Sequence, residues 1–363
     1  MNPQRRDVRV PGYSLTRLLG AGGMADVHEA VQLNLGRVVA AKIRRRRRDN
    51  HEQRLRERFI QSARLHAKLS HPSIVNVIDL VSTDEVDALI LECLRGPSLE
   101  QRLRNEGPIP VPTLIRLTQQ IVLALRYLHE ANVVHRDIKP SNIMHVSSHL
   151  DSAVRIMDFG VARGPMNTGE LTIKGAQVGT LWYMSPEQLA GKESGSSCDL
   201  FALAVSLYEL ATGRLPLSSR EQSAVFRRHL DHEPIPAWPK EIYESYPEFC
   251  DLVEACLGVA FDSRLVSVGV FGALMNGLAQ RYLPEAPTSE VPFEKEHVLE
   301  RNLISLPNDR RARLKRLLAF RGNEQTTLTV STSMIQDSGS VSSLEDTVLT
   351  VPITGSSDSD GQF

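Results

Sequence analysis

The first 95 residues carry short apolar runs separated by glycines and polar turns, which is the pattern of β-strands. Between residues 51 and 69 the apolar side chains instead recur at steps of three or four, which predicts one helix that ends before Pro72. The expected strands cover residues 14–19, 27–32, 37–43 and 88–91. This part of the chain is therefore predicted to be a β-rich lobe with a single helix.

From Pro112 onward the apolar spacing becomes helical, beginning with a stripe of leucine and isoleucine that runs to His129. Further helices are expected over residues 198–212, 223–230, 249–257 and 265–278. A β-rich lobe followed by a helical lobe predicts an α+β fold with two lobes and a cleft between them. On this basis the N-terminal segment covers residues 1–12 and the two-lobed domain residues 13–281, with its lobes at about 13–94 and 95–281.

The regular spacing of apolar residues weakens after Tyr282. Residues 282–322 are predicted to form a linker followed by a basic helical extension over residues 309–321, whose few apolar side chains are expected to pack on the helical lobe. Serine and threonine make up 16 of the last 41 residues, 323–363. Because this segment has too few large apolar side chains to offset the entropy of ordering, it is predicted to be a disordered acidic tail.

Charge changes this picture more than composition does. The net charge is −1, but residues 1–322 carry +5 and the tail carries −6. The totals are not those of a nucleic-acid or membrane binder, and no apolar run is long enough to span a bilayer. The four cysteines form no C-x-x-C pair and the N-terminus has no signal-peptide pattern, so a cytoplasmic location is expected.

Five consecutive arginines occupy residues 44–48, between the third expected strand and the helix. They are expected to form a loop whose side chains extend into solvent. A docking patch for an acidic partner or a nucleic acid is the alternative.

A glycine-rich turn and a strand lysine are the first residues with candidate chemistry. The turn runs from Gly20 to Val27 between two strands, and its small residues would let backbone N–H groups approach a polyphosphate. Lys42 ends an apolar strand, where its ammonium could neutralise phosphate oxygens. Each signal is weak alone, because glycine turns and lysines at strand ends are common.

The decisive segment is the run HRDIKPSN at residues 135–142, with DFG at residues 158–160. Phosphoryl transfer needs a carboxylate to orient a hydroxyl, oxygen ligands for magnesium, and cations near the phosphoryl group, and these residues supply all of them. A Gly-Thr pair at 179–180 and a Ser-Pro-Glu run at 185–187 follow in order. Over residues 13–281 the chain therefore resembles the eukaryotic-like (Hanks-type) bacterial serine/threonine protein kinases.

The resemblance implies transfer of the γ-phosphoryl group of ATP, with Mg²⁺ or Mn²⁺, to serine or threonine of protein substrates, including the chain itself. It assigns Asp137 as the catalytic base, Lys139 to the γ-phosphate, and Asn142 and Asp158 to the metal. The ATP-binding positions that it implies are Gly20, Ala21, Gly22, Gly23, Val27, Lys42, Glu92 and Leu94. The structural positions are Glu187, Asp199 and Arg264.

One position departs from the family pattern. The helix residue that normally supplies a glutamate to the strand lysine is Ser62. Glu57 lies about 140° further round the helix and cannot simply replace it. Two interpretations follow: an active kinase whose Lys42 is held by Asp158 or by phosphate, or a nucleotide-binding pseudokinase scaffold. Retention of the transition-state groups favours activity.

Regulation by phosphorylation is also implied. Arg136 matches the family's receptor for a phosphate on the activation loop, with Thr172 as the first candidate acceptor and Thr168 as the second. In the tail, the pattern E-x-T-x-L-T-V occurs twice and places Thr326 and Thr347 at equivalent positions. A short repeat of this kind can arise by chance in a low-complexity segment. The hypothesis is that these threonines are phosphorylated and then bound by a phosphothreonine-binding partner.

Overall fold

The computed structural model describes residues 8–22, 25–46, 52–158, 180–192, 194–216, 236–258, 264–284 and 307–319. All of them belong to one unit, Met1–Gly322, and the second unit is Asn323–Phe363. The strands are β1 (Tyr13–Ala21), β2 (Asp26–Gln32), β3 (Arg37–Arg45), β4 (Val77–Ser82), β5 (Val86–Glu92), β6 (Ile143–His145) and β7 (Val154–Ile156). The helices are α1 (Glu52–His66), α2 (Leu99–Glu106), α3 (Val111–Glu130), α4 (Pro186–Leu189), α5 (Ser197–Thr212), α7 (Lys240–Ser245), α8 (Pro247–Ala255), α9 (Val268–Tyr282) and α11 (Asn308–Ala319), with the short 3-10 turns η1 (Pro140–Asn142) and η3 (Thr180–Tyr183).

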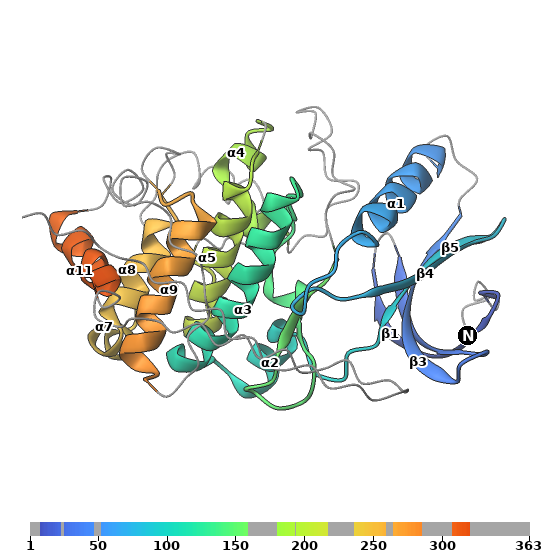
Figure 1. Ribbon diagram of the computed structural model, residues 1–363, viewed down its shortest axis with the longest axis horizontal. Helices are drawn as coiled ribbons and strands as arrows, with labels where there is room; N and C mark the ends of the chain where they lie inside the picture. The colour runs from blue at the N-terminus through green and yellow to red at the C-terminus, as the bar shows by residue number, and fades with distance from the viewer. Residues whose placement is uncertain are drawn as a thin grey trace, which may run out of the picture. The chain divides into compact units, whose positions relative to one another are not determined.

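The first five strands form one antiparallel sheet in the order β1-β2-β3-β5-β4, and α1 lies along one of its faces (Figure 1). Phe59 and Ala63 of α1 pack with Ala40 of β3 on that face. Val39, Ala41 and Ile43 belong to the core on the opposite face. Since side chains alternate along a strand, Lys42 and Arg44 lie on the face that carries α1.

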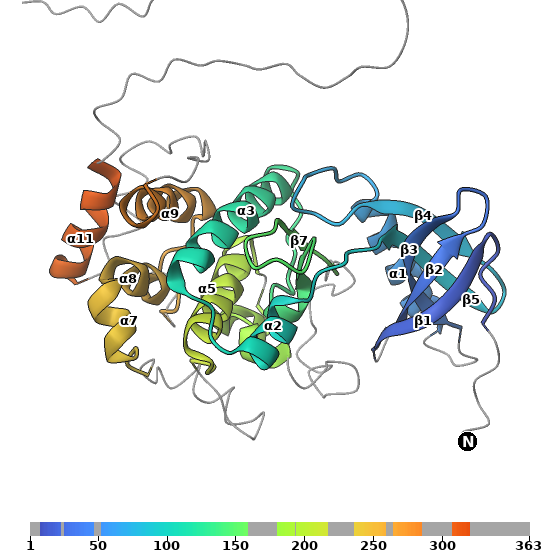
Figure 2. The same cartoon turned by 90° about the horizontal axis from the view of Figure 1, so that it is seen from below.

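The helical part packs around α3, which contacts α5 and α9, as the view in Figure 2 shows. Its core contains fully buried large side chains such as Leu125, Phe201, Phe249 and Phe271. The two short strands β6 and β7 pair beside α3. These two parts confirm the expected α+β arrangement. No helix within the described residues is long and apolar enough to cross a membrane.

Helix ends follow local capping chemistry. Ser98 begins α2 with a capping box, in which its hydroxyl accepts from Gln101 N and the Gln101 side chain accepts from Ser98 N. Ser267 caps α9 by accepting from Val270 N. Gly213 ends α5 at a φ of 73°, a left-handed conformation that glycine adopts without strain.

Most expected elements are confirmed, with ends shifted by a few residues. The helices expected at 51–69, 198–212, 249–257 and 265–278 correspond to α1, α5, α8 and α9, and the helix that begins near Pro112 is α3. Strands β4, β6 and β7 and helices α2, α4 and α7 were missed. Strand β4 contains Asp79 and only half-buried or exposed side chains, so it carries no alternating pattern. The helix expected over 223–230 lies outside the described residues.

The basic extension packs on the helical part, as expected. Helix α11 contacts α8 and α9, and its Leu314 and Leu317 are 0% and 1% exposed. The backbone of Leu317 approaches Gly277 of α9 so closely that a Cβ there would lie 2.6 Å from the Leu317 carbonyl oxygen. Arg313 Nε of α11 lies 2.7 Å from Oδ2 of the fully buried Asp251.

The expectation that residues 44–48 form a solvated loop is wrong for the first residues of this run. Arg44 and Arg45 are the last residues of β3, and Arg44 is only 5% exposed. Arg46 lies 3.5 Å from the buried Asp87 carboxylate. Alternation along β3 directs Arg44 toward the α1 face, where carboxylates neutralise it, whereas Arg45, the last residue of the strand, is exposed. Arg47 and Arg48 lie outside the described residues.

Candidate active site

The sheet brings the glycine turn and the strand lysine together. In the strand register Gly20 is opposite Val27, and Val27 is opposite Lys42, so the three positions form a row across β1, β2 and β3. Ala21 pairs with Asp26 one step closer to the turn, and Gly22 follows directly after β1. Gly23 lies outside the described residues. Among the described residues, the pair Ala21–Asp26 is therefore the only one between the row that contains Lys42 and the start of the turn.

Lys42 reaches across to a residue 116 positions later in the chain. Its Nζ donates to Asp158 Oδ1 at 2.7 Å. Burial by itself would raise the pKa of Asp158, but the Lys42 ammonium outweighs it and holds that pKa below its ordinary value. Asp158 has a φ of 57°, a left-handed conformation that is uncommon for a residue with a side chain. The carboxylate partner of Lys42 thus comes from the segment after β7.

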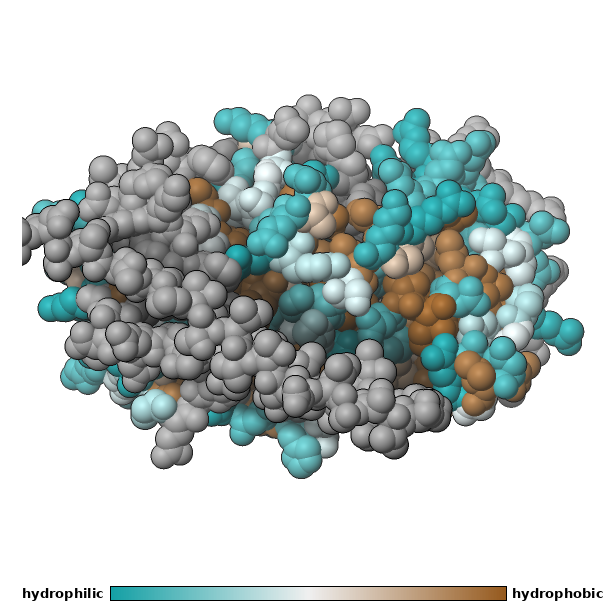
Figure 3. Space-filling model, in the orientation of Figure 1, coloured by the Kyte–Doolittle hydropathy of each residue, from teal (hydrophilic) through white to brown (hydrophobic). Residues whose placement is uncertain are grey.

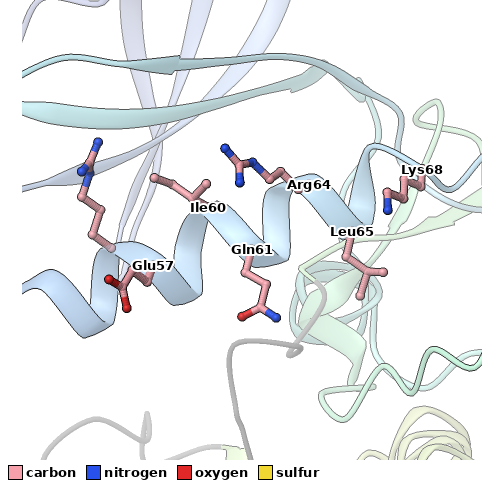
Figure 4. A pocket seen from close by; sticks show the side chains of 7 residues that line it. Glu57, Ile60, Gln61, Arg64, Leu65 and Lys68 are labelled. Atoms are coloured by element: carbon pink, nitrogen blue, oxygen red, sulfur yellow. The ribbon is translucent and has the colours of Figure 1, made fainter.

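Helix α1 does not supply a substitute carboxylate through Glu57. The Glu57 side chain is exposed and accepts from Gln53 Nε2 at 3.0 Å. In Figure 4 Glu57 and Gln61 project from the opposite side of α1 to Ile60 and Arg64.

A cavity of about 750 Å³ lies along helix α1, and none of its lining residues is Lys42, Asp137 or Asp158. The outer surface over α1 is hydrophilic (Figure 3).

Asp137, Lys139 and Asn142 form a compact cluster in the loop between α3 and β6. Lys139 Nζ lies 3.1 Å from Asp137 Oδ2, and the Asn142 amide donates to the same oxygen at 2.9 Å and to the Asp137 carbonyl at 2.8 Å. The Asp137 and Lys139 side chains are each 11% exposed. Met157 N donates to the Asn142 carbonyl at 2.8 Å, which joins the cluster to the segment that carries Asp158.

A buried carboxylate shapes the loop before Asp137. Asp199 of α5 is fully buried and accepts from the backbone N–H groups of His135 at 2.9 Å and Arg136 at 2.7 Å. His129 Nε2 lies 2.9 Å from the same carboxylate. These contacts hold Arg136 at a φ of 63°. Burial lowers the pKa of His135, whose Nε2 lies 3.0 Å from the Met157 carbonyl oxygen.

Glu187 and Arg264, two of the expected structural positions, form an ion pair. The Arg264 Nη2 donates to Glu187 Oε1, and the Arg264 side chain is 1% exposed. Its guanidinium also lies 5.4 Å from the centre of the Phe201 ring. Burial by itself would raise the pKa of Glu187, but Arg264 outweighs it and lowers that pKa.

Glu92 and Leu94 occupy the connection from β5 to the helical part. Glu92 ends β5 opposite Val39 of β3, and its backbone N–H donates to the Asn76 carbonyl. Its carboxylate accepts from Arg155 Nη1 at 2.7 Å. Arg155 and His129 were missed by sequence reasoning because their partners lie 63 and 70 positions away, so no local pattern reveals them.

Asn142 and Asp158 are the residues expected to hold a metal ion. Within the described part of the chain no group of three or more histidine, cysteine or acidic side chains could hold one. One carboxylate and one amide oxygen nevertheless fit magnesium, which commonly uses one or two carboxylates together with substrate phosphates and water. The expected phosphorylation sites Thr168, Thr172, Thr326 and Thr347 all lie outside the described residues.

Most of the chain is similar to known proteins. Residues 13–274 match the protein kinase domain family. A probable serine/threonine-protein kinase of Corynebacterium efficiens is 38% identical over 229 residues, which cover 62% of this chain and 34% of that protein. Serine/threonine-protein kinase PrkC of Bacillus subtilis is 34% identical over 226 residues, with 62% and 34% covered. The chain thus spans about a third of the length of these curated relatives.

The fold is similar to that of a solved structure. A crystal structure of Rad53 residues 1–466 in complex with AMP-PNP matches with a TM-score of 0.59 and 24% identity, covering 70% of this chain and 62% of that one. At this level of identity the likeness concerns the fold. The sheet with its single helix and the helical part therefore share the fold of that solved structure.

Proposed function

Because this chain belongs to the protein kinase family, we propose that it transfers the γ-phosphoryl group of ATP to serine or threonine hydroxyls of protein substrates. One observation carries the proposal. The Asp137–Lys139–Asn142 cluster is joined through Met157 to the segment whose Asp158 pairs with Lys42. A carboxylate that can orient a hydroxyl is thereby combined with cations that can bind phosphate, as phosphoryl transfer requires.

Asp137 is the proposed catalytic base. Its Oδ2 is held by the Asn142 amide and the Lys139 ammonium, so the carboxylate keeps one orientation. The substrate hydroxyl would donate its proton to this carboxylate while its oxygen attacks the γ-phosphorus. The bond from that phosphorus to the bridging oxygen then breaks, and ADP leaves. Lys139 is placed to offset the negative charge on the migrating phosphoryl group.

Nucleotide binding is assigned to the sheet side of the site. Backbone N–H groups of Gly20, Ala21, Gly22 and Gly23 are proposed to cover the phosphates, with Val27 at the end of this phosphate-covering loop and Lys42 on the α- and β-phosphates. The register of Gly20, Val27 and Lys42 across three strands supports this assignment. The backbone at Glu92 and Leu94 is proposed to hydrogen-bond the adenine.

Asn142 and Asp158 are the proposed ligands of Mg²⁺ or Mn²⁺. The Asn142 amide nitrogen donates to Asp137, so its oxygen is the atom that can face a cation. When bound, the ion would neutralise phosphate oxygens in the transition state. Lys42 is paired with Asp158, and nucleotide phosphates would compete with that carboxylate for the Lys42 ammonium.

Regulatory roles complete the proposal. The guanidinium of Arg136 is proposed to bind a phosphate on Thr172 or Thr168, which would order the activation loop. Autophosphorylation of Thr326 and Thr347 would create sites for a phosphothreonine-binding partner, and the repeated motif supports this. Mass spectrometry after incubation with ATP and Mg²⁺ tests it, and finding no phosphate after Gly322 would contradict it.

A cytoplasmic location stays a prediction. All four cysteines are free thiols, three of them buried, and this supports it.

The deciding experiment compares wild type with Asp137→Asn in transfer of radiolabelled γ-phosphate to a generic protein substrate. ATP-induced shifts in melting temperature measure nucleotide binding in parallel. We expect the variant to bind ATP and to lose nearly all incorporation, because its amide cannot accept the hydroxyl proton. Equal incorporation by both proteins contradicts the assignment of Asp137. Binding of ATP without incorporation by either would indicate the pseudokinase scaffold.

A further inference from the structure

Helix α1 lacks a glutamate at position 62, yet the structure contains a strand-to-helix ion pair elsewhere. Arg44 follows Lys42 by two residues on β3, so both side chains lie on the face that carries α1. The Arg44 guanidinium donates to both carboxylate oxygens of Glu52, at 2.8 and 2.6 Å. Glu52 is the first residue of α1. The Arg44 and Glu52 side chains are 6% and 14% exposed, so water screens this bidentate pair little.

A second carboxylate extends this pair into a network. Asp87 of β5 is directly opposite Arg44 in the sheet register and is fully buried. Its carboxylate lies 3.6 Å from Arg44, 3.5 Å from Arg46 and 3.4 Å from Arg56, and it accepts from the Ser82 hydroxyl at 2.8 Å. Because Arg56 belongs to α1, the first two turns of the helix are joined to β3 and to β5.

The other end of α1 is held differently. His66, its last residue, is buried, and its Nε2 lies 2.8 Å from the Val75 carbonyl oxygen. Ala63 and Phe59 pack in the small core under the helix. Ser62 therefore lies between a charged anchor at the start of α1 and a packed, hydrogen-bonded anchor at its end.

We propose that the Arg44–Glu52 ion pair, supported by Asp87, is the positioning contact that holds α1 against β3 and keeps Lys42 directed at Asp158 in this chain. Arg44 and Glu52 act through Lys42 and touch no substrate. Arg44 is two residues from Lys42 on β3. From there the Arg44–Glu52 pair performs the task that a glutamate at position 62 would perform by contacting Lys42 directly. The inference rests on the proposed kinase function.

The test uses Glu52→Gln in the full-length chain, which removes one charge and preserves the side-chain shape. Glu57→Gln is the matched control, because Glu57 is an exposed glutamate on the same helix that bonds only a neighbouring glutamine in the described contacts. We expect Glu52→Gln to lower kcat/KM for ATP at least tenfold and to speed amide exchange across α1. The control should stay within twofold of wild type. Adding Ser62→Glu to Glu52→Gln should restore most of the lost kcat/KM, a rescue that a purely structural role would not produce.

The outcomes separate this inference from the proposed function. If wild type shows no Asp137-dependent incorporation, the proposed function fails, and amide exchange in α1 still decides whether Glu52 anchors the helix. If wild type is active and Glu52→Gln matches Glu57→Gln in kcat/KM, the positioning role is overturned. A loss of activity that Ser62→Glu leaves unchanged overturns it as well.

Discussion

Helix α11 lies beyond the matched family region, and its contacts imply that it contributes to the stability of the folded unit. We predict that Leu317→Ala lowers the free energy of unfolding by about 3 kcal/mol, within the range of about 2–5 kcal/mol for leucine truncation in a core. Leu317 is 1% exposed and its backbone abuts Gly277, so the site has little room to collapse around the cavity. Against a total stability of about 5–15 kcal/mol, this loss is a large fraction.

Urea denaturation followed by fluorescence or circular dichroism measures the effect. With a slope of about 3 kcal/mol/M, the midpoint should fall by about 1 M while the slope stays unchanged. Arg316→Ala is the control, because Arg316 is an exposed residue of the same helix and alanine favours helix formation. Equal midpoints for Leu317→Ala and Arg316→Ala would refute the reasoning, since they would mean that α11 adds nothing to the folded unit.

Three further predictions concern ionisable side chains that are buried or partly buried. Glu187→Gln strands the Arg264 guanidinium and should cost about 3–5 kcal/mol, seen as a fall in melting temperature of at least about 6 °C; an unchanged melting temperature would contradict it. Burial lowers the pKa of His66 from 6.5 to about 4, so the unfolded chain binds more protons between those values and stability falls as pH drops through that window, by about 2 kcal/mol at pH 5. His66→Gln should flatten the pH dependence of denaturation between pH 6.5 and 4, and an identical profile would rule this out. Asp199→Asn weakens the acceptor that holds the backbone of His135 and Arg136, before the proposed base Asp137, and should lower kcat at least tenfold in the phosphate-transfer assay, whereas an unaltered kcat would remove that role.

The secondary structure was predictable wherever a segment's own pattern was strong. Alternation along β3 and the helical spacing of α3 each follow from burial of one face, which is a local property of the sequence. Strand β4 was missed because Asp79 interrupts it and its side chains are at most half buried. It is a strand because β5 offers it a hydrogen-bonding edge.

The candidate catalytic residues of the 135–142 run were chosen from sequence because the run resembles a kinase motif, and the structure brings Asp137, Lys139 and Asn142 together within one short loop. The absence of a glutamate at position 62 was equally visible. What the sequence could not state is how the chain compensates for it.

Partners on different elements were decided by the tertiary structure alone. The pairing of Lys42 with Asp158 spans 116 positions, and the position of Asp87 opposite Arg44 depends on the register of β3 with β5. The run of five arginines was predicted to be a solvated loop. In the structure Arg44 and Arg46 instead belong to an ion network, because the packing of the fold brings carboxylates next to them. Local sequence determined which residue types were present and which face each would occupy. Register and packing determined which charges met, because electrostatic energy depends on distance and burial in the assembled fold.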